Sequence, residues 1–169
     1  MRIGIDAREL QPVGLTGIGR YLRNFLGYAR TATAEHEYHL VGHHRPDDLG
    51  LGHRGQFHQL PHAPTLLEDH VVLPMCAARE SLDVFFSPYY KCPWDSPAPA
   101  VIVIHDLHFL GTGLTARLGR RYVQALAARA ARIVTVSEYT KRTILETLGP
   151  VVHARTVHSP TAALSPTRT

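Results

Sequence analysis

Short apolar runs alternate along the chain with longer segments in which apolar residues recur at helical spacing. Residues 2–7 and 38–42 predict strands, and residues 101–104 form a solid β-branched run of the kind that parallel sheets bury. Residues 21–29 place apolar side chains three or four positions apart, which predicts a helix between the first two strands. The pattern thus switches between the period of a strand and that of a helix.

The middle of the chain is less regular. Residues 43–64 are rich in Gly, Pro, His and Asp, with a weak strand pattern at residues 56–60. Residues 66–78 predict a helix that Pro74 interrupts, and residues 82–86 form a further apolar run. The elements are least clearly marked in this part of the sequence.

The last third of the chain returns to clear alternation. Residues 115–131 predict a helix, one face of which carries Leu118, Tyr122, Leu126 and Ala130. A buried strand is predicted at residues 133–136, followed by a helix that Ser137 caps and Gly149-Pro150 terminates. Residues 152–157 predict a last strand.

These elements together predict an α/β fold. Strands of four to six residues that alternate with longer helices indicate a Rossmann-like, doubly wound, mostly parallel sheet with helices on both faces. At 169 residues the chain is about the size of one domain. We assign residues 1–158 to that domain and residues 159–169, a Pro/Ser/Thr/Ala segment, to an interdomain linker or tail whose second domain is absent.

Composition narrows the class of protein. With 44% hydrophobic and 19% charged residues, the sequence is that of a soluble globular protein. The net charge of +4 comes from scattered basic residues, which argues against a nucleic-acid surface. No apolar stretch is long enough to span a membrane, and two cysteines are too few for a disulfide framework. We expect a cytoplasmic protein, either free or peripheral to the membrane.

Twelve histidines raise the question of a metal site. Their spacings match no zinc template, and no grid of cysteines or carboxylates accompanies them. The sequence therefore predicts solvated loop histidines, with no bound metal and no cofactor.

A glycine-rich turn follows the first predicted strand and leads into a helix, with Thr16 as its candidate N-cap. The free amides of such a helix start favour a phosphate, so we take as candidate ligand-binding residues Gly17, Ile18, Gly19 and Arg20. The turn fails as a dinucleotide fingerprint because Leu22 stands where the third glycine belongs. A flexible connection without a ligand is the alternative.

His105 and Asp106 come directly after the most hydrophobic predicted strand, at the sheet edge where open α/β folds bind ligands. A histidine there can hydrogen-bond a sugar hydroxyl or a reacting oxygen, which makes His105 the candidate catalytic residue and Asp106 a candidate binding residue. The alternative is a histidine that ends the strand beside an aspartate that turns the loop.

Two further segments offer candidate binding residues. Ser137 lies at a strand-to-helix junction with Lys141 one turn later, so the junction can hold an anion, or Ser137 can simply cap the helix. Tyr89 follows Ser87-Pro88, which end the apolar run at residues 82–86. A tyrosine there can stack on a sugar or pack in the core.

Five segments in register resemble the N-terminal domain of GT-B fold retaining glycosyltransferases of family 4. They are Ile3 to Arg8, Gly17 to Tyr21, Asp83 to Pro88, Val103 to Leu107 and Ile133 to Arg142. By that resemblance, the intact enzyme transfers a hexose from a nucleoside diphosphate sugar to a carbohydrate or lipid-linked acceptor hydroxyl, with retention. His105 would contact the donor sugar, and the glycine loop would lie near the diphosphate and the acceptor.

The resemblance also implies an incomplete enzyme. In this family the C-terminal domain holds most of the donor nucleotide, so this chain alone is expected to be inactive. The open cleft face would then favour self-association into a homo-oligomer. Two other hypotheses stand beside it: a non-catalytic module that binds an acceptor or a partner, and a nucleotide- or sugar-phosphate-binding α/β protein of another family. The first hypothesis requires Gly17, Gly19 and His105 to converge at one edge of the sheet.

Overall fold

The computed structural model forms two compact units. The first comprises Met1–Pro88 and Pro93–Ala100, and the second comprises Tyr89–Cys92 and Val101–Thr169. Within these units the structure describes residues 1–11, 14, 16–32, 36–46, 51–107 and 113–158. The predicted tail, residues 159–169, lies outside the described residues.

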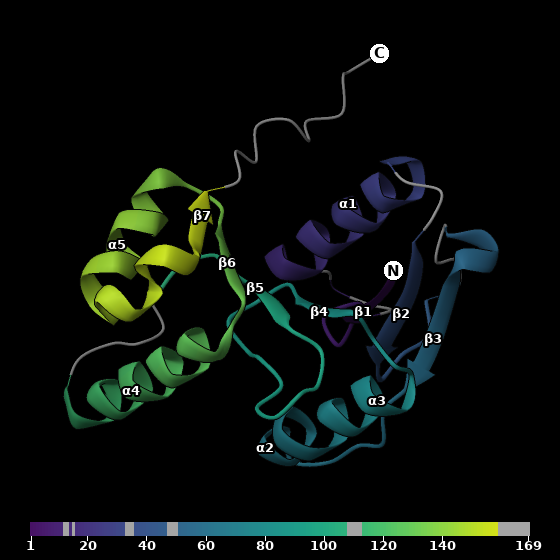
Figure 1. The fold of residues 1–169 in the computed structure, drawn as a ribbon, viewed down its shortest axis with the longest axis horizontal. Helices are drawn as coiled ribbons and strands as arrows, with labels where there is room; N and C mark the ends of the chain where they lie inside the picture. The colour runs from purple at the N-terminus through teal and green to yellow at the C-terminus, as the bar shows by residue number, and fades with distance from the viewer. Residues whose placement is uncertain (12–13, 15, 33–35, 47–50, 108–112, 159–169) are drawn as a thin grey trace. The chain divides into compact units, whose positions relative to one another are not determined.

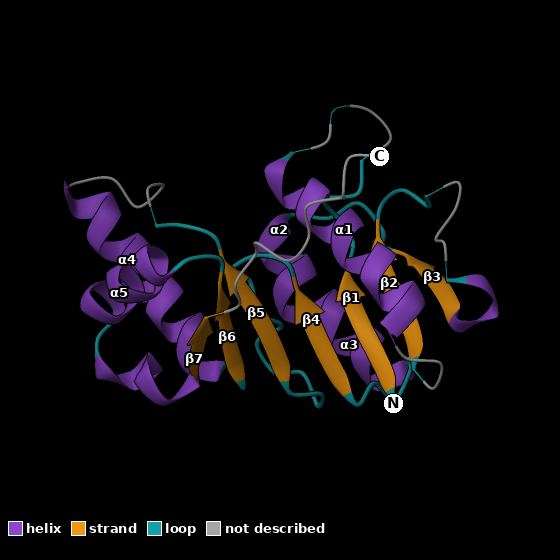
Figure 2. Ribbon diagram, turned by 90° about the horizontal axis from the view of Figure 1, so that it is seen from above, coloured by secondary structure: helices purple, strands orange, loops and turns teal. Residues whose placement is uncertain are grey.

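The first unit is built on four parallel strands, β1 (Arg2–Asp6), β2 (Glu37–Gly42), β3 (Gly55–Gln59) and β4 (Val84–Ser87). Their order is β3-β2-β1-β4, so the first strand of the chain lies inside the sheet (Figure 2). All the predicted strands of this half are present. Because the strands are parallel, their carboxyl ends share one edge, where loops can gather side chains around a ligand.

Helices cover both faces of these strands. The first helix, α1 (Gly17–Ala32), stacks Phe25 on Phe86 of β4, with ring centroids 4.4 Å apart. The neighbouring Phe85 is fully buried in a cluster with Leu73 and Ala77 of α3 (Leu73–Arg79). Successive side chains of a strand point to opposite faces, so α1 and α3 lie on opposite sides of the sheet (Figure 1). The predicted doubly wound arrangement is confirmed in this unit.

The expected interruption at Pro74 takes the form of a π-helical turn. The short helix α2 (Thr65–Leu67) continues through a π-helical turn at Glu68–Val72 into α3, with Pro74 in the first turn of α3. Proline lacks an amide hydrogen, and a wider turn before it lets the chain stay helical without that bond. This turn aims Glu68 and Asp69 into the protein, where both are buried.

The second unit also alternates parallel strands with helices. It contains β5 (Ala100–Ile104) from Val101 onward, β6 (Arg132–Thr135) and β7 (Thr156–His158), which are parallel and lie in the order β5-β6-β7. Its helices are α4 (Gly113–Arg129) and α5 (Glu138–Leu148). The β-branched run of β5 is buried at Ile102, Val103 and Ile104, as the sequence predicts.

The predicted strand at residues 152–157 is wrong in its first part. Residues Pro150–Arg155 form a 3-10 helix, and β7 begins only at Thr156. Gly149 ends α5 with φ 76°, and Pro150 starts a new turn because its ring already holds the helical φ. The Thr156 hydroxyl donates to the Val152 carbonyl at 2.7 Å and ties the strand to that turn.

The predicted buried face of α4 is also wrong at one end. Leu118 is 59% exposed, and the helix buries Ala116, Val123, Leu126 and Ala127 instead. Eight residues at roughly 100° each carry Leu118 about 80° around the helix from Leu126. The face predicted from both leucines therefore turns toward solvent at its N-terminal end.

Among the described residues, no helix is both long and apolar enough to cross a membrane.

Candidate functional site

The glycine turn ends in a capped helix start. Thr16 accepts a hydrogen bond from the Gly19 amide at 2.9 Å, and its hydroxyl donates to Glu9 at 2.9 Å. Its predicted role as the N-cap of α1 is thereby confirmed. The Arg20 amide makes the first intrahelical bond, to the Thr16 carbonyl at 3.0 Å, so the amides of Gly17 and Ile18 precede that ladder. Such amides at the positive end of a helix dipole suit a phosphate.

The side chains around this helix start differ in exposure. Gly17 and Arg20 are exposed, Ile18 is half-buried and Gly19 is buried. Apart from its chain neighbours and its own helix backbone, no atom of the described residues lies within 4 Å of a Cβ added at Gly17, so these residues leave the space beside its backbone open. The turn can therefore admit a ligand at Gly17.

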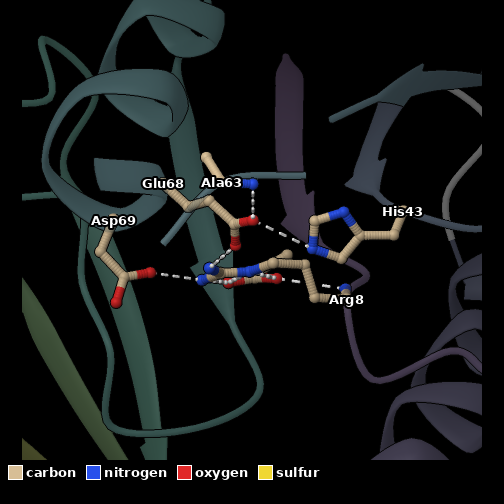
Figure 3. A network of polar contacts seen from close by, with 6 residues as sticks. Arg8, His43, Ala63, Glu68 and Asp69 are labelled. Atoms are coloured by element: carbon tan, nitrogen blue, oxygen red, sulfur yellow. Dashed lines mark hydrogen bonds and ion pairs between the residues drawn. The ribbon is translucent and has the colours of Figure 1, made fainter. Parts of the chain in front are cut away.

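An arginine in the first unit binds three buried carboxylates (Figure 3). Arg8 lies 2.7 Å from Asp6, 3.0 Å from Glu68 and 2.6 Å from Asp69, each measured from a guanidinium nitrogen to a carboxylate oxygen. All four side chains are at most 7% exposed. We refer to these four residues as the Arg8 cluster.

The elements place the Arg8 cluster at the carboxyl ends of the strands. Asp6 is the last residue of β1 and Arg8 follows two positions later, while Glu68 and Asp69 come from the π-helical turn. His43, directly after β2, brings its Nε2 to 3.3 Å from the Glu68 carboxylate. The cluster thus ties the end of β1 to the helical segment that covers one face of the sheet.

Electrostatics keep the Glu68 carboxylate charged. Burial by itself raises the pKa of Glu68, but hydrogen bonds from the Arg8 side chain and from the Ala63 amide, at 3.2 Å, lower it below the usual value. Arg8 is the shared partner of all three carboxyl groups in this cluster. Since Arg8 engages all three, we assign it the role of holding the edge in shape.

The sequence did not point to Glu68 or Asp69, because no motif surrounds them and 60 residues separate Glu68 from Arg8. The available signal was Asp6-Ala7-Arg8 itself, two opposite charges placed directly after a buried strand.

The second unit has its own polar edge. His105 and Asp106 directly follow β5, and Ser137 caps α5 by accepting a hydrogen bond from the Thr140 amide at 3.0 Å. The Thr140 hydroxyl donates to the His105 carbonyl at 3.0 Å and lies 2.9 Å from the Ser137 hydroxyl. The N-terminus of α5 is thereby fastened to the backbone of His105.

The exposure of these residues suits a surface that meets a ligand. His105 and Lys141 are half-buried, and Asp106 is exposed. The Lys141 ammonium lies 3.7 Å from Glu138 in the first turn of α5. Ser137 is confirmed as a helix cap, and anion binding at this junction stays a prediction.

Tyr89 is almost fully buried, 7% exposed, with the ring of Tyr90 edge-on at 6.5 Å. The Lys91 ammonium lies 5.4 Å from the centroid of the Tyr89 ring. Burial on this scale favours the packing interpretation of Tyr89 over the stacking of a sugar.

Gly17 and Gly19 belong to the first unit and His105 to the second. Their expected convergence at one edge therefore stays a prediction.

The chain is similar to known proteins in both sequence and fold. Residues 15–162 match the family model Glycosyltransferase Family 4. The fold is similar to the crystal structure of Anabaena HepE in complex with UDP and glucose, with a TM-score of 0.58 and 14% sequence identity. That alignment covers 93% of this chain and 43% of HepE, so the chain spans less than half the length of that structure. No curated protein matches the chain.

Proposed function

The chain belongs to glycosyltransferase family 4, and on that premise we propose that it is the N-terminal, acceptor-side part of an enzyme that transfers a hexose from a nucleoside diphosphate sugar to an acceptor hydroxyl, with retention. The observation that carries the proposal is the family match, which spans both compact units. HepE, a protein of similar fold, was solved with UDP and glucose, which supports a nucleotide-linked sugar as donor.

The helix starts support the handling of a diphosphate. At α1 the amides of Gly17 and Ile18 precede the intrahelical ladder, and at α5 Lys141 places an ammonium in the first turn, 3.7 Å from the Glu138 carboxylate. Either terminus stabilises the charge that develops on a leaving diphosphate, without a bound metal. This supports a direct role for backbone amides in the transfer.

His105 is the proposed catalytic residue. Its position directly after β5 puts the imidazole at the carboxyl edge, and the Thr140 hydroxyl holds its carbonyl in place. An imidazole there can hydrogen-bond a hydroxyl of the donor sugar or the reacting oxygen as the glycosidic bond breaks. Asp106, exposed beside it, is proposed to bind an acceptor hydroxyl.

The assay compares the 169-residue chain alone with the same chain inside a two-domain enzyme that supplies a family 4 C-terminal half. With a panel of radiolabelled nucleoside diphosphate sugars, we expect no transfer by the isolated chain and transfer by the two-domain enzyme. Robust transfer by the isolated chain would contradict the expectation that transfer requires the C-terminal half. If no donor is used by a folded two-domain enzyme, the proposed function is wrong.

His105→Ala in the two-domain enzyme is expected to lose most of its turnover while its circular dichroism spectrum stays unchanged. His153→Ala, which removes an exposed histidine of the same unit, is the matched control and is expected to keep full turnover. Equal rates for the two variants would leave His105 as a residue that merely ends the strand.

A further inference from the structure

Two histidines and a glutamate meet on the α3 side of the first unit. His39 comes from β2, His58 from β3 and Glu80 from the end of α3. One ring nitrogen of each histidine and a carboxylate oxygen of Glu80 all lie within 4.8 Å of one another. The closest pair is His39 Nδ1 and His58 Nε2, at 2.9 Å, and His58 Nδ1 lies 3.5 Å from Glu80 Oε1.

Strand pairing brings the two rings together. His58 is in register with Val41, which lies two residues after His39 and therefore on the same face of β2. Val41 belongs to the apolar cluster that α3 covers, so both histidines lie on the α3 face. The Glu80 amide then ends α3 by donating to the Cys76 carbonyl at 3.0 Å, which fixes the backbone of the third residue.

One nitrogen of this group lacks a partner. The His39 side chain is fully buried, and no hydrogen-bond partner for its Nε2 exists in the part of the chain that the structure describes. If Nδ1 of His39 carries the hydrogen and donates to His58, Nε2 is a buried lone pair without a donor. If His58 donates instead, Nε2 of His39 is a buried donor without an acceptor, and His58 turns an unprotonated Nδ1 toward the Glu80 carboxylate. Either hydrogen-bonded arrangement leaves His39 unsatisfied.

We propose that His39, His58 and Glu80 form a Zn²⁺ site. Two imidazoles and one carboxylate are an established ligand set for this ion, with water at the fourth position. With Nδ1 bound to the metal, Nε2 of His39 carries a hydrogen, and the Glu37 carboxylate lies 3.9 Å away, beyond hydrogen-bond distance but close enough for electrostatic attraction. Arg79, whose Nε donates to Glu80 at 2.8 Å, orients the third ligand.

The electrostatic setting agrees with this ligand set. Burial, together with the nearby Arg2 side chain, lowers the pKa of His39, and burial lowers the pKa of His58 as well. Neutral imidazole is the form that binds a metal, so the burial of these rings is compatible with this ligand set.

The location sets this site apart from the residues proposed for sugar transfer. The Asp83 amide donates to the Arg2 carbonyl at 2.9 Å, so the segment that follows Glu80 lies beside the start of β1. The Arg8 cluster lies at the opposite, carboxyl end of that strand. An ion held here cross-links β2, β3 and the end of α3, and it stabilises the edge of the sheet that β3 forms.

The test measures zinc affinity of the purified 169-residue chain by competition with a chromophoric chelator. His58→Gln and Glu80→Gln each remove one ligand, and His53→Gln removes an exposed histidine just before β3 as the matched control. We expect one zinc ion per chain, at least tenfold weaker binding in the two ligand variants, and unchanged binding in the control. The melting temperature is expected to fall on chelator treatment in the wild type and the control only.

Equal zinc affinity in all four proteins, or no zinc retained by the folded wild type, would overturn the proposal. Circular dichroism checks that each variant folds. If a ligand variant does not fold, the X-ray absorption spectrum of zinc bound to the wild type tests the site instead. We expect imidazole scattering with nitrogen at about 2.0–2.1 Å from the zinc. The absence of that scattering would reject the site. None of these readouts depends on the proposed sugar transfer.

Discussion

The Thr140 hydroxyl donates a hydrogen bond to the His105 carbonyl, 35 residues earlier, at 3.0 Å. This bond joins the first turn of α5 to the end of β5, and the same hydroxyl lies 2.9 Å from the Ser137 side chain that caps the helix. Thr140 is itself only 7% exposed, so water cannot readily replace it. The backbone position of His105 thus depends on the helix that follows β6.

Thr140→Val is expected to move His105. The change keeps the shape of the side chain but removes the donor of the hydrogen bond to the His105 carbonyl, which lowers the free energy of unfolding by about 1–2 kcal/mol. Urea denaturation measures that loss. In the two-domain enzyme the same variant is expected to lower kcat more than it raises KM.

Thr143→Val is the matched control, because the Thr143 hydroxyl donates to the Tyr139 carbonyl within the same helix, α5. It is expected to change stability by less than about 0.5 kcal/mol and to leave kcat unchanged. A Thr140 variant that behaves like the Thr143 variant would show that the bond to His105 is dispensable.

Arg8→Met is expected to destabilise the chain strongly. It would remove the Arg8 guanidinium from the buried carboxylates of Asp6, Glu68 and Asp69, and losing one partner of a buried ion pair costs about 3–5 kcal/mol. Chemical denaturation at pH 7 measures the loss. Arg23→Met, at an exposed position of α1, is the control and is expected to be nearly neutral. A loss below 1 kcal/mol for Arg8→Met would mean that water reaches these carboxylates.

The Glu68 carboxylate predicts a pH dependence. Its pKa is lowered in the folded protein, because hydrogen bonds from Arg8 and Ala63 outweigh the effect of burial. A carboxyl group with a lowered pKa contributes stability above its unfolded value of 4.5 and loses it as the pH falls through the folded pKa. The free energy of unfolding is therefore expected to fall below pH 4.5. Glu68→Gln should be less stable at pH 7 and show a shallower fall in acid, and an identical pH profile would contradict this role.

The thiols of Cys76 and Cys92 are expected to react slowly. Burial raises the pKa of Cys92 to about 11 and also raises the pKa of Cys76, so few thiolates exist at pH 8. In the native protein, alkylation by iodoacetamide should be at least tenfold slower than in urea. Mass spectrometry measures the extent of labelling over time. Rapid labelling of the folded chain would contradict the prediction and show that one of these segments opens readily.

Local patterns determined most of the elements. The β-branched run of β5 and the N-caps at Thr16 and Ser137 depend on neighbours a few residues away, so their structures could be predicted from spacing alone. The same patterns misplaced the start of β7, because Pro150 fits a new helical turn as well as it ends an old one.

The tertiary structure alone decided which distant charges meet. Arg8 finds Glu68 and Asp69 through a π-helical turn, and His39 finds His58 through the pairing of two parallel strands. Nothing in the spacing of these residues encodes such contacts, since a strand register and a helix rotation depend on how whole apolar faces pack. Local periodicity predicted the parallel α/β framework and its helix caps, and the sequence also placed His105 directly after a buried strand. The role of His105 in transfer stays a prediction. The Arg8 cluster and the group of His39, His58 and Glu80 depend instead on how the helices pack against the sheet.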